Sequence, residues 1–186
     1  MKYLKSITSL VLIAFLFAGC KDDGADFTLS YDGANNTAPE LPASTYESGA
    51  MFPTSFAGND AGNELYAVEL YIEEIPNTAE LRVYLNGRTD DELVYSKSIL
   101  REIGSRDWIT HTLDAPVTLD GSDLWVTLRY DQQGNVRVLG CDSGPEESLN
   151  SNWHYDAADN EWVPFNDRVN ADINWNIRAL VRVPEE

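Results

Sequence analysis

Three aromatic residues near the C-terminal end of the chain are placed where they could stack on a sugar. Trp153, Tyr155 and Trp162 flank residues 156–160, which have the composition of a hairpin loop. Indole and phenol rings have apolar faces that suit a sugar ring, and neighbouring Asp and Asn side chains would hydrogen-bond its hydroxyl groups. The same spacing fits a cross-strand aromatic pair that only stabilises the hairpin. The exposure of the rings distinguishes the two interpretations.

Catalysis finds little support in the sequence. Nucleophilic hydrolysis requires a serine or cysteine beside a base, yet His111 lies within a predicted strand, His154 adjoins the hairpin, and there is no Gly-x-Ser-x-Gly motif. The acidic pair Glu146 and Glu147 follows Gly-Pro and is typical of a solvated turn rather than of a glycosidase carboxylate pair. We therefore expect no enzymatic activity.

Metal ligation is plausible for calcium only, and no cofactor is required. Calcium prefers oxygen ligands, and several acidic residues lie in predicted loops beside strand ends: Asp32, Glu47, Asp60, Asp142 and Asp172. No Asp-x-Asp-x-Asp-Gly loop fixes their spacing, so the sequence assigns no metal ligands. His111, His154 and Cys141 stand apart from one another, which disfavours a transition-metal site. We expect Cys141 to be a buried, small apolar residue.

The first residues of the chain predict export. An apolar run ending on Cys20 follows Lys2 and Lys5, and it is too short to cross a bilayer. Residues 1–19 are therefore predicted to be a signal peptide and Cys20 a lipid attachment point. The alternative is an ordinary signal peptide that is cleaved nearby.

The end of this run, Phe17-Ala18-Gly19-Cys20, resembles the lipobox of bacterial lipoproteins. In that class the cysteine is acylated and becomes the N-terminus, so the resemblance implies membrane attachment through Cys20. The class usually has leucine three positions before the cysteine, whereas this chain has Phe17 there and Leu16 one position earlier, a variation found in lipoproteins of Bacteroidetes-type bacteria.

Residues 20–26 are predicted to be a tether ahead of a domain spanning residues 27–186. The run Lys21-Asp22-Asp23 resembles the surface-export signal of lipoproteins in the same bacteria. This implies an outer-membrane address facing the cell exterior. The alternative is a solvated tether without an export role.

The charge of the chain excludes one class of partner. The whole sequence has a net charge of −18, and removal of residues 1–19 takes away Lys2 and Lys5 and no acid, which leaves −20. A body this acidic is repelled by phosphate backbones and by anionic lipids. Nucleic acid is therefore not expected as a partner.

Beyond residue 50 the apolar residues recur every second position, which indicates strands. Residues 65–72 and 80–85 are expected to form an antiparallel pair around a turn at 75–78, whereas residues 32–49 have a loop composition. Further strands are predicted at residues 28–31, 93–96, 108–113, 124–130, 136–139, 152–155, 161–164 and 174–183. Trp125 and Trp175 are expected in the core, and a helical turn only within 98–104. The sequence therefore predicts an all-β fold, a two-sheet antiparallel β-sandwich of jelly-roll type.

Residues 50–183 resemble the jelly-roll adhesin domains of Bacteroidetes surface proteins, including the cleaved-adhesin domains of gingipain-type proteases and haemagglutinins. The most specific segments are Asp142-Ser143-Gly144-Pro145 and Asn174-Trp175-Asn176-Ile177-Arg178. The resemblance implies a binding module, with structural calcium in several members. The partners proposed for that family are host proteins, haem-bearing proteins or glycans.

Two function classes follow. The preferred one is a non-catalytic, lipid-anchored surface module that binds an extracellular glycan or protein. Its alternative is a structural or accessory lipoprotein subunit of an outer-membrane surface assembly, with no free ligand. Exposed Trp153 and Trp162 beside polar groups would favour a glycan, whereas a large flat apolar patch would favour assembly.

Overall fold

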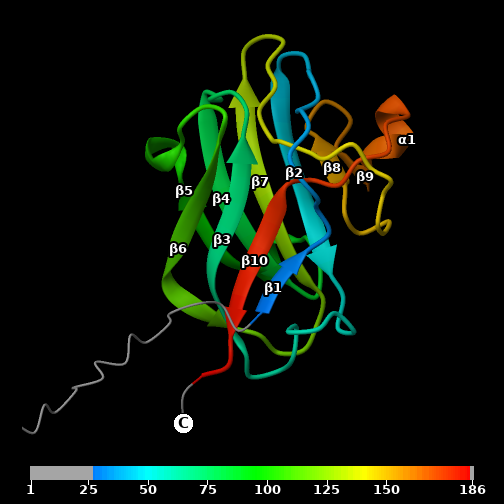
Figure 1. Cartoon of the computed structure of the whole chain (residues 1–186). Helices are drawn as coiled ribbons and strands as arrows, with labels where there is room; N and C mark the ends of the chain where they lie inside the picture. The colour runs from blue at the N-terminus through cyan, green and yellow to red at the C-terminus, as the bar shows by residue number, and fades with distance from the viewer. Residues whose placement is uncertain (1–26, 185–186) are drawn as a thin grey trace, which may run out of the picture.

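The computed structural model describes residues 27–184, which form a β-sandwich of two antiparallel sheets (Figure 1). The predicted signal peptide and the whole predicted tether, residues 20–26 with Cys20, lie outside these residues. The strands are β1 (Phe27–Ser30), β2 (Ser44–Phe52), β3 (Glu64–Ile72), β4 (Thr78–Leu85), β5 (Leu93–Ser98), β6 (Asp107–Thr118), β7 (Leu124–Gln132), β8 (Trp153–Asp156), β9 (Glu161–Pro164) and β10 (Ile177–Arg182). Short helical segments are η1 (Asp90–Glu92), η2 (Leu100–Glu102) and α1 (Phe165–Val169). No helix within residues 27–184 is long and apolar enough to cross a membrane.

The strand order is that of a jelly roll with an added hairpin. One sheet has the order β1-β10-β3-β6 and the other β5-β4-β7-β2-β8-β9. The chain passes from one sheet to the other at most connections, which gives the two interlocked Greek keys of this fold. The β8–β9 hairpin extends the second sheet beyond β2, and α1 follows it at the same side of the molecule (Figure 1).

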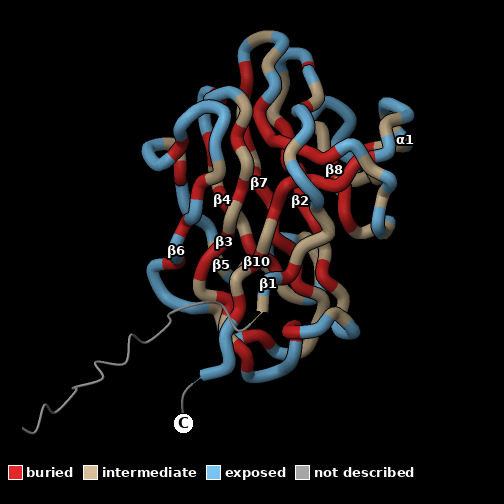
Figure 2. The backbone as a smooth tube through the Cα atoms, viewed as in Figure 1, coloured by how far each residue is buried: buried red, intermediate tan, exposed pale blue. Residues whose placement is uncertain are grey.

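The core lies between the two sheets, where the inward side chains of both are buried (Figure 2). It is built from the alternate residues of each strand, such as Leu81 and Val83 on β4 and Val68 and Leu70 on β3. Each such side chain contributes about 1.5–3 kcal/mol when it is fully removed from water. Trp175 is 1% exposed and belongs to this core, as the sequence predicted.

Strand β2 was not predicted, because its residues have the composition of a loop. It nevertheless lies in the middle of the six-stranded sheet and pairs with β7 and β8. Its two polar residues at the centre are satisfied there: Ser48 hydrogen-bonds the ring of His154 at 2.8 Å, and Glu47 accepts hydrogen bonds from two hydroxyl groups. Polar side chains with such partners are compatible with a buried central strand.

The expected pairing of residues 65–72 with 80–85 is wrong. Strand β3 pairs with β10 and β6, whereas β4 pairs with β5 and β7 in the other sheet. The connection through Ile75 and Pro76 therefore crosses between layers instead of closing a hairpin. A period of two shows which side chains share a face but does not show which sheet the strand joins.

Three smaller expectations are settled by the structure. Residues 136–139 form isolated bridges, Leu41 to Val136 and Ile72 to Leu139, rather than a strand. The predicted hairpin at 152–164 is confirmed as β8 and β9, and the helical turn predicted within 98–104 is confirmed as η2. Helix α1 was not predicted, since five residues are too few to display a helical repeat.

Candidate ligand-binding site

The candidate site lies on the open face of the six-stranded sheet, which is the side turned away from the four-stranded sheet. Side chains alternate between the two faces along each strand. On β7, Leu124 and Val126 belong to the core, so Trp125 and Thr127 point to the open face. The same argument places further residues there: Thr45, Glu47 and Met51 of β2, Glu80, Arg82 and Tyr84 of β4, Arg129 and Asp131 of β7, Trp153 and Tyr155 of β8, and Trp162 of β9.

The pairing register decides which of these side chains are neighbours. Glu47 on β2 pairs with Arg129 on β7 and with Tyr155 on β8. Two residues further along β2, Gly49 pairs with Trp153. Because Gly49 has no side chain, the indole of Trp153 meets no β2 side chain at that position. The aromatic residues of the added hairpin thus lie directly beside the charged residues of the jelly-roll strands.

The predicted aromatic residues come together at one side of the open face. Tyr155 and Trp162 are direct cross-strand partners with ring centroids 5.5 Å apart. Trp153 packs on Trp125 of β7 with centroids 5.6 Å apart. Trp153, Tyr155 and Trp162 are partly buried, and Trp125 is 6% exposed. Trp125 was expected in the core, but the structure places it in this cluster instead.

The guanidinium of Arg88 lies over this aromatic cluster. Arg88 follows β4, and its Cζ is 4.3 Å from the ring centroids of both Trp125 and Trp153 and 5.0 Å from that of Trp162. Its Nη1 and the Nε1 of Trp153 are buried without a hydrogen-bond partner among the described residues. Burial lowers the pKa of Arg88, and the charge of Glu47 only partly opposes this effect.

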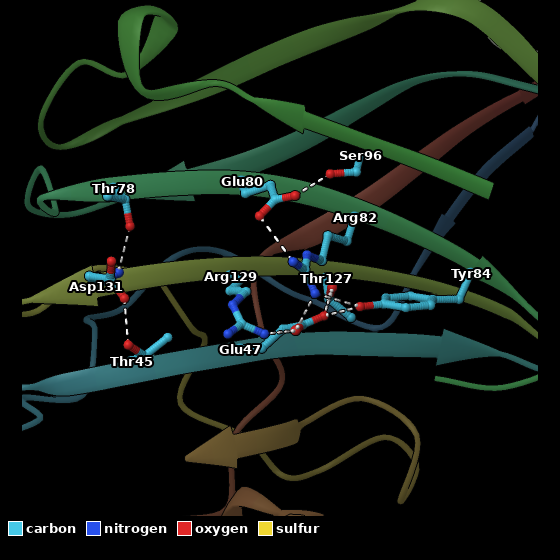
Figure 3. A network of polar contacts seen from close by, with 10 residues as sticks. All are labelled: Thr45, Glu47, Thr78, Glu80, Arg82, Tyr84, Ser96, Thr127, Arg129 and Asp131. Carbon is cyan, nitrogen blue, oxygen red and sulfur yellow. Dashed lines mark hydrogen bonds and ion pairs between the residues drawn. The ribbon is translucent and has the colours of Figure 1, made fainter. Parts of the chain in front are cut away.

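A polar network occupies the middle of the open face (Figure 3). At its centre is Glu47, which is 3% exposed and accepts hydrogen bonds from the Tyr84 hydroxyl at 2.8 Å and the Thr127 hydroxyl at 2.6 Å. The guanidinium groups of Arg82 and Arg129 lie 3.5 and 3.8 Å from its carboxylate. Burial raises the pKa of Tyr84, as does the neighbouring Glu47 carboxylate. The network fixes the positions of two arginines.

Next to this network the open face is hollowed. A depression of about 640 Å³ is lined by Thr45, Thr78, Ala79, Glu80, Ser96, Lys97, Ser98, Arg129 and Asp131. The Asp131 carboxylate accepts a hydrogen bond from the Thr45 hydroxyl, and the Asp131 backbone N–H donates one to the Thr78 hydroxyl. Glu80 accepts hydrogen bonds from Ser96 and Arg82. Burial would raise the pKa of Glu80, but those hydrogen bonds outweigh it and the pKa is lowered. The lining therefore offers hydroxyl groups, carboxylates and cations, and its volume is in the range of small-molecule sites.

The acidic residues considered as calcium ligands have other partners. The carboxylate of Asp142 accepts hydrogen bonds from the backbone N–H groups of Gly33, Gly144 and Asn174 and from the Asn174 side chain. Burial would raise its pKa, but these hydrogen bonds hold the pKa below its ordinary value. N–H donors therefore already surround this carboxylate.

Two more of these acids are also paired. Asp32 forms an ion pair with Arg178 at 2.9 Å, and Asp172 accepts a hydrogen bond from the backbone of Glu146. Asp60 is exposed. Residues 27–184 contain no group of three or more His, Cys, Asp or Glu side chains that could hold a metal ion. Structural calcium stays a prediction.

The remaining residues with catalytic chemistry are buried away from the open face. His154 points into the core with Ser48, and both are at most 1% exposed. His111 lies between the Glu102 carboxylate and the Tyr95 hydroxyl, each at 2.7 Å. Cys141 is buried, as predicted, and burial raises the pKa of its thiol to about 12.

Sequence reasoning missed Arg88, Trp125 and the role of Glu47 in this site. Trp125 lies between the apolar residues Leu124 and Val126. Apolar side chains therefore fall on both faces of this strand, and the pattern does not show which face is the core. Arg88 lies in a turn, where side-chain direction has no periodic signal. The sequence held one partial indication for Glu47. It lies two residues before Gly49, so the two residues share a face if this run forms a strand.

Comparisons with known proteins agree with the fold. No protein-family model matches the chain, and no curated protein matches it in sequence. Two solved structures do match, both of Cwp84. One is described as the clostridial cysteine protease Cwp84 after propeptide cleavage, with a TM-score of 0.58 and 12% identity over 85% of this chain. The other contains the cysteine protease and lectin-like domains of Cwp84, a surface layer associated protein of Clostridium difficile, with a TM-score of 0.53 and 12% identity over 76% of this chain.

This likeness defines a class of fold rather than an activity. The match spans only 40% and 33% of the two Cwp84 chains, and the identity is low. The chain is a jelly-roll β-sandwich whose open sheet face bears an aromatic cluster, a buried ionic network and a polar depression.

Proposed function

We propose that this protein is a non-catalytic, cell-surface module that binds a glycan on the open face of its six-stranded sheet. The observation that carries the proposal is the position of Trp153, Tyr155 and Trp162 on the same face as the polar depression. Aromatic rings suit the apolar face of a sugar, and the hydroxyl and carboxylate groups of the depression suit its hydroxyl groups. Both features lie on strands, which hold them in place.

The comparisons support a binding module rather than a protease. Cwp84 has cysteine protease and lectin-like domains, and the single cysteine among residues 27–184 is ill suited to nucleophilic catalysis. Cys141 is buried, its thiol has a raised pKa, and no hydrogen bond joins it to His111 or His154. We infer that the part in common is the lectin-like domain. The resemblance to Bacteroidetes adhesin domains points in the same direction.

The rival proposal, an accessory subunit that docks through an apolar surface, has less support. The large apolar side chains that are most exposed among residues 27–184 include Val94, on β5 at one edge of the six-stranded sheet, and Val169, in α1 beyond the other edge (Figure 1). The others are Ile75, Leu149 and Val183. A docking surface would be expected to gather such residues into one patch.

A glycan array tests the proposal. The probe is the chain from residue 20 onward with Cys20→Ser, in calcium and in a chelator. We expect binding that is lost or weakened at least tenfold in Trp162→Ala and Trp153→Ala. Trp108→Ala is the matched control, because Trp108 is a partly buried tryptophan of β6 in the other sheet. If no glycan is bound, or if Trp108→Ala has the same effect with folding intact, the proposal fails.

We further propose that the protein is anchored by lipid on Cys20 in the outer membrane and faces the exterior. Cells that are given a radioactive fatty acid should label the wild-type protein and not Cys20→Ser. Protease added to intact cells should degrade the protein if it faces outward, and replacement of the acidic residues Asp22 and Asp23 should protect it. Labelling of Cys20→Ser would refute the anchor.

A further inference from the structure

Arg88 differs from the other partly buried arginines in having no anionic partner. Most arginines in residues 27–184 form an ion pair with a carboxylate: Arg82, Arg106, Arg129, Arg137, Arg168, Arg178 and Arg182. Arg101 is exposed to solvent. Arg88 is partly buried, yet no described carboxylate or hydrogen-bond acceptor contacts its guanidinium. In a chain with 31 acidic residues, this is an unusual environment for an arginine.

The aromatic cluster explains how the guanidinium is held without a carboxylate. Trp125, Trp153 and Trp162 are all within 5.0 Å of Arg88 Cζ, measured to their ring centroids. Such contacts are electrostatic, and they strengthen as the cation is removed from water. The rings engage the charge but accept no conventional hydrogen bonds. Stacking therefore leaves the N–H groups of the guanidinium edge without protein acceptors.

A guanidinium edge that is fixed and unpaired is suited to one kind of ligand group. Its parallel N–H donors match the two oxygens of a carboxylate, or those of a sulfate, in a bidentate pair. Glu47 is the carboxylate whose charge raises the pKa of Arg88, and it is already engaged by Tyr84, Thr127 and Arg82. No described residue therefore supplies an acceptor for Arg88, whose Nη1 is buried without one.

We propose that the open face selects an acidic sugar, whose carboxylate or sulfate is bound by Arg88 while its ring stacks beside Trp162 and Tyr155. This inference rests on the proposed glycan-binding function and adds the chemical class of the glycan. It assigns Arg88 as the residue that determines specificity.

The net charge of the protein strengthens the argument for a specific contact. A body with a net charge near −20 repels polyanions at long range, so general electrostatic attraction would not bring an acidic glycan to this face. Long-range repulsion is screened by salt, whereas a partly buried contact is screened much less. We therefore expect binding to require one anionic group at Arg88 and to persist at physiological ionic strength.

The competing explanation is that Arg88 covers an aromatic site for neutral sugars. In that case its removal would uncover the three indole rings and strengthen the binding of neutral glycans. The two explanations predict opposite effects for the same substitution, which makes Arg88→Gln the decisive variant.

The experiment measures binding of matched acidic and neutral oligosaccharides to the chain from residue 20 onward with Cys20→Ser. Galacturonate oligomers are compared with their methyl esters, and sulfated with desulfated chondroitin oligosaccharides, so that the carboxylate and sulfate sources are separated. We expect at least tenfold tighter binding of one acidic member than of its neutral counterpart. Arg88→Gln should remove this preference, Arg88→Lys should retain only part of it because ammonium lacks the planar fork, and the exposed control Arg101→Gln should retain it.

The outcomes distinguish failure of the acidic-sugar inference from failure of glycan binding itself. Equal binding of acidic and neutral members by the wild type refutes the selection of an acidic sugar and leaves glycan binding in place. Stronger neutral binding by Arg88→Gln shows that Arg88 is a cover. No binding of any glycan refutes both. The wild-type comparison needs no variant, so the test does not depend on the folding of Arg88→Gln.

Discussion

Mild acidification should destabilise this domain through protonation of the buried imidazole of His154. Its ring lies among the aromatic side chains of the core, with centroids 5.2 Å from those of Tyr46 and Phe165 and 6.3 Å from that of Trp175. Burial and, to a smaller extent, the charge of Arg168 lower the pKa of His154 to about 4, although the charge of Asp156 partly opposes them. The imidazole is therefore neutral in the folded protein at pH 7.

The direction and size of the effect follow from this pKa. In the unfolded chain His154 takes up a proton near pH 6.5, whereas in the fold it does so near pH 4. Between these values the unfolded state binds an additional proton, so the free energy of unfolding falls as the pH decreases. The whole interval corresponds to about 3 kcal/mol, and acidification from pH 7.5 to 5 to about 2 kcal/mol. For a domain of this size the melting temperature should fall by about 4–8 °C.

The assay is urea unfolding at pH 7.5, 6 and 5, carried out on the wild type and on His154→Phe. The phenyl ring suits the surrounding rings, and the lost hydrogen bond to Ser48 affects the variant at every pH, so it does not alter the pH dependence. His111 and the carboxylates are present in both proteins, so their contributions cancel in the difference. The wild type should lose about 2 kcal/mol more than His154→Phe between pH 7.5 and 5. Parallel pH profiles for the two proteins would refute the argument that burial keeps His154 neutral.

Two further predictions test the packing. Gly49→Ala should lower the free energy of unfolding by about 1–3 kcal/mol in urea titrations, because an added Cβ would lie 2.5 Å from both Thr127 Cγ2 and the Val126 carbonyl oxygen. Gly104→Ala meets no atom within 4 Å and should be nearly neutral; equal effects would contradict the clash. Cys141 should resist iodoacetamide at pH 8 in the folded protein and react in denaturant, and rapid labelling of the native state would show that its thiol is accessible.

Most of the fold could be predicted from the alternation of apolar residues, because this pattern records burial of one sheet face directly. The prediction failed at β2, where buried residues are polar instead of apolar. Glu47 and Ser48 are buried on β2, but their partners lie on other strands and are far away in sequence: Tyr84, Thr127 and His154. A single sequence does not display such partners, so β2 resembles a loop until the neighbouring strands are placed.

The aromatic residues of the hairpin could be predicted from the sequence, whereas Trp125 and Arg88 could not be assigned to the site. Trp153, Tyr155 and Trp162 share one hairpin, and their spacing alone places them on a common face. Trp125 and Arg88 reach the same position from β7 and from the turn after β4, which only the jelly-roll topology brings together. The aromatic rings therefore have a local sequence signal, whereas the cation that lies over them has none.

The site is assembled from two parts of the fold, which are expected to have different roles in binding. The jelly-roll strands and the turn after β4 supply Trp125, the Glu47 network and Arg88, and the added β8–β9 hairpin supplies the other rings. The hairpin residues on the open face, such as Tyr155 and Trp162, can change without disturbing the core, since the inward-facing residue of β8 is His154. Changes in the hairpin would then alter how a sugar stacks on its rings. The position of the Arg88 guanidinium depends on the rings of both the hairpin and β7. Substitution of either Trp125 or Trp153 should therefore weaken selection of the anionic group as well as stacking, because the same indoles that could contact a sugar also hold Arg88 in place.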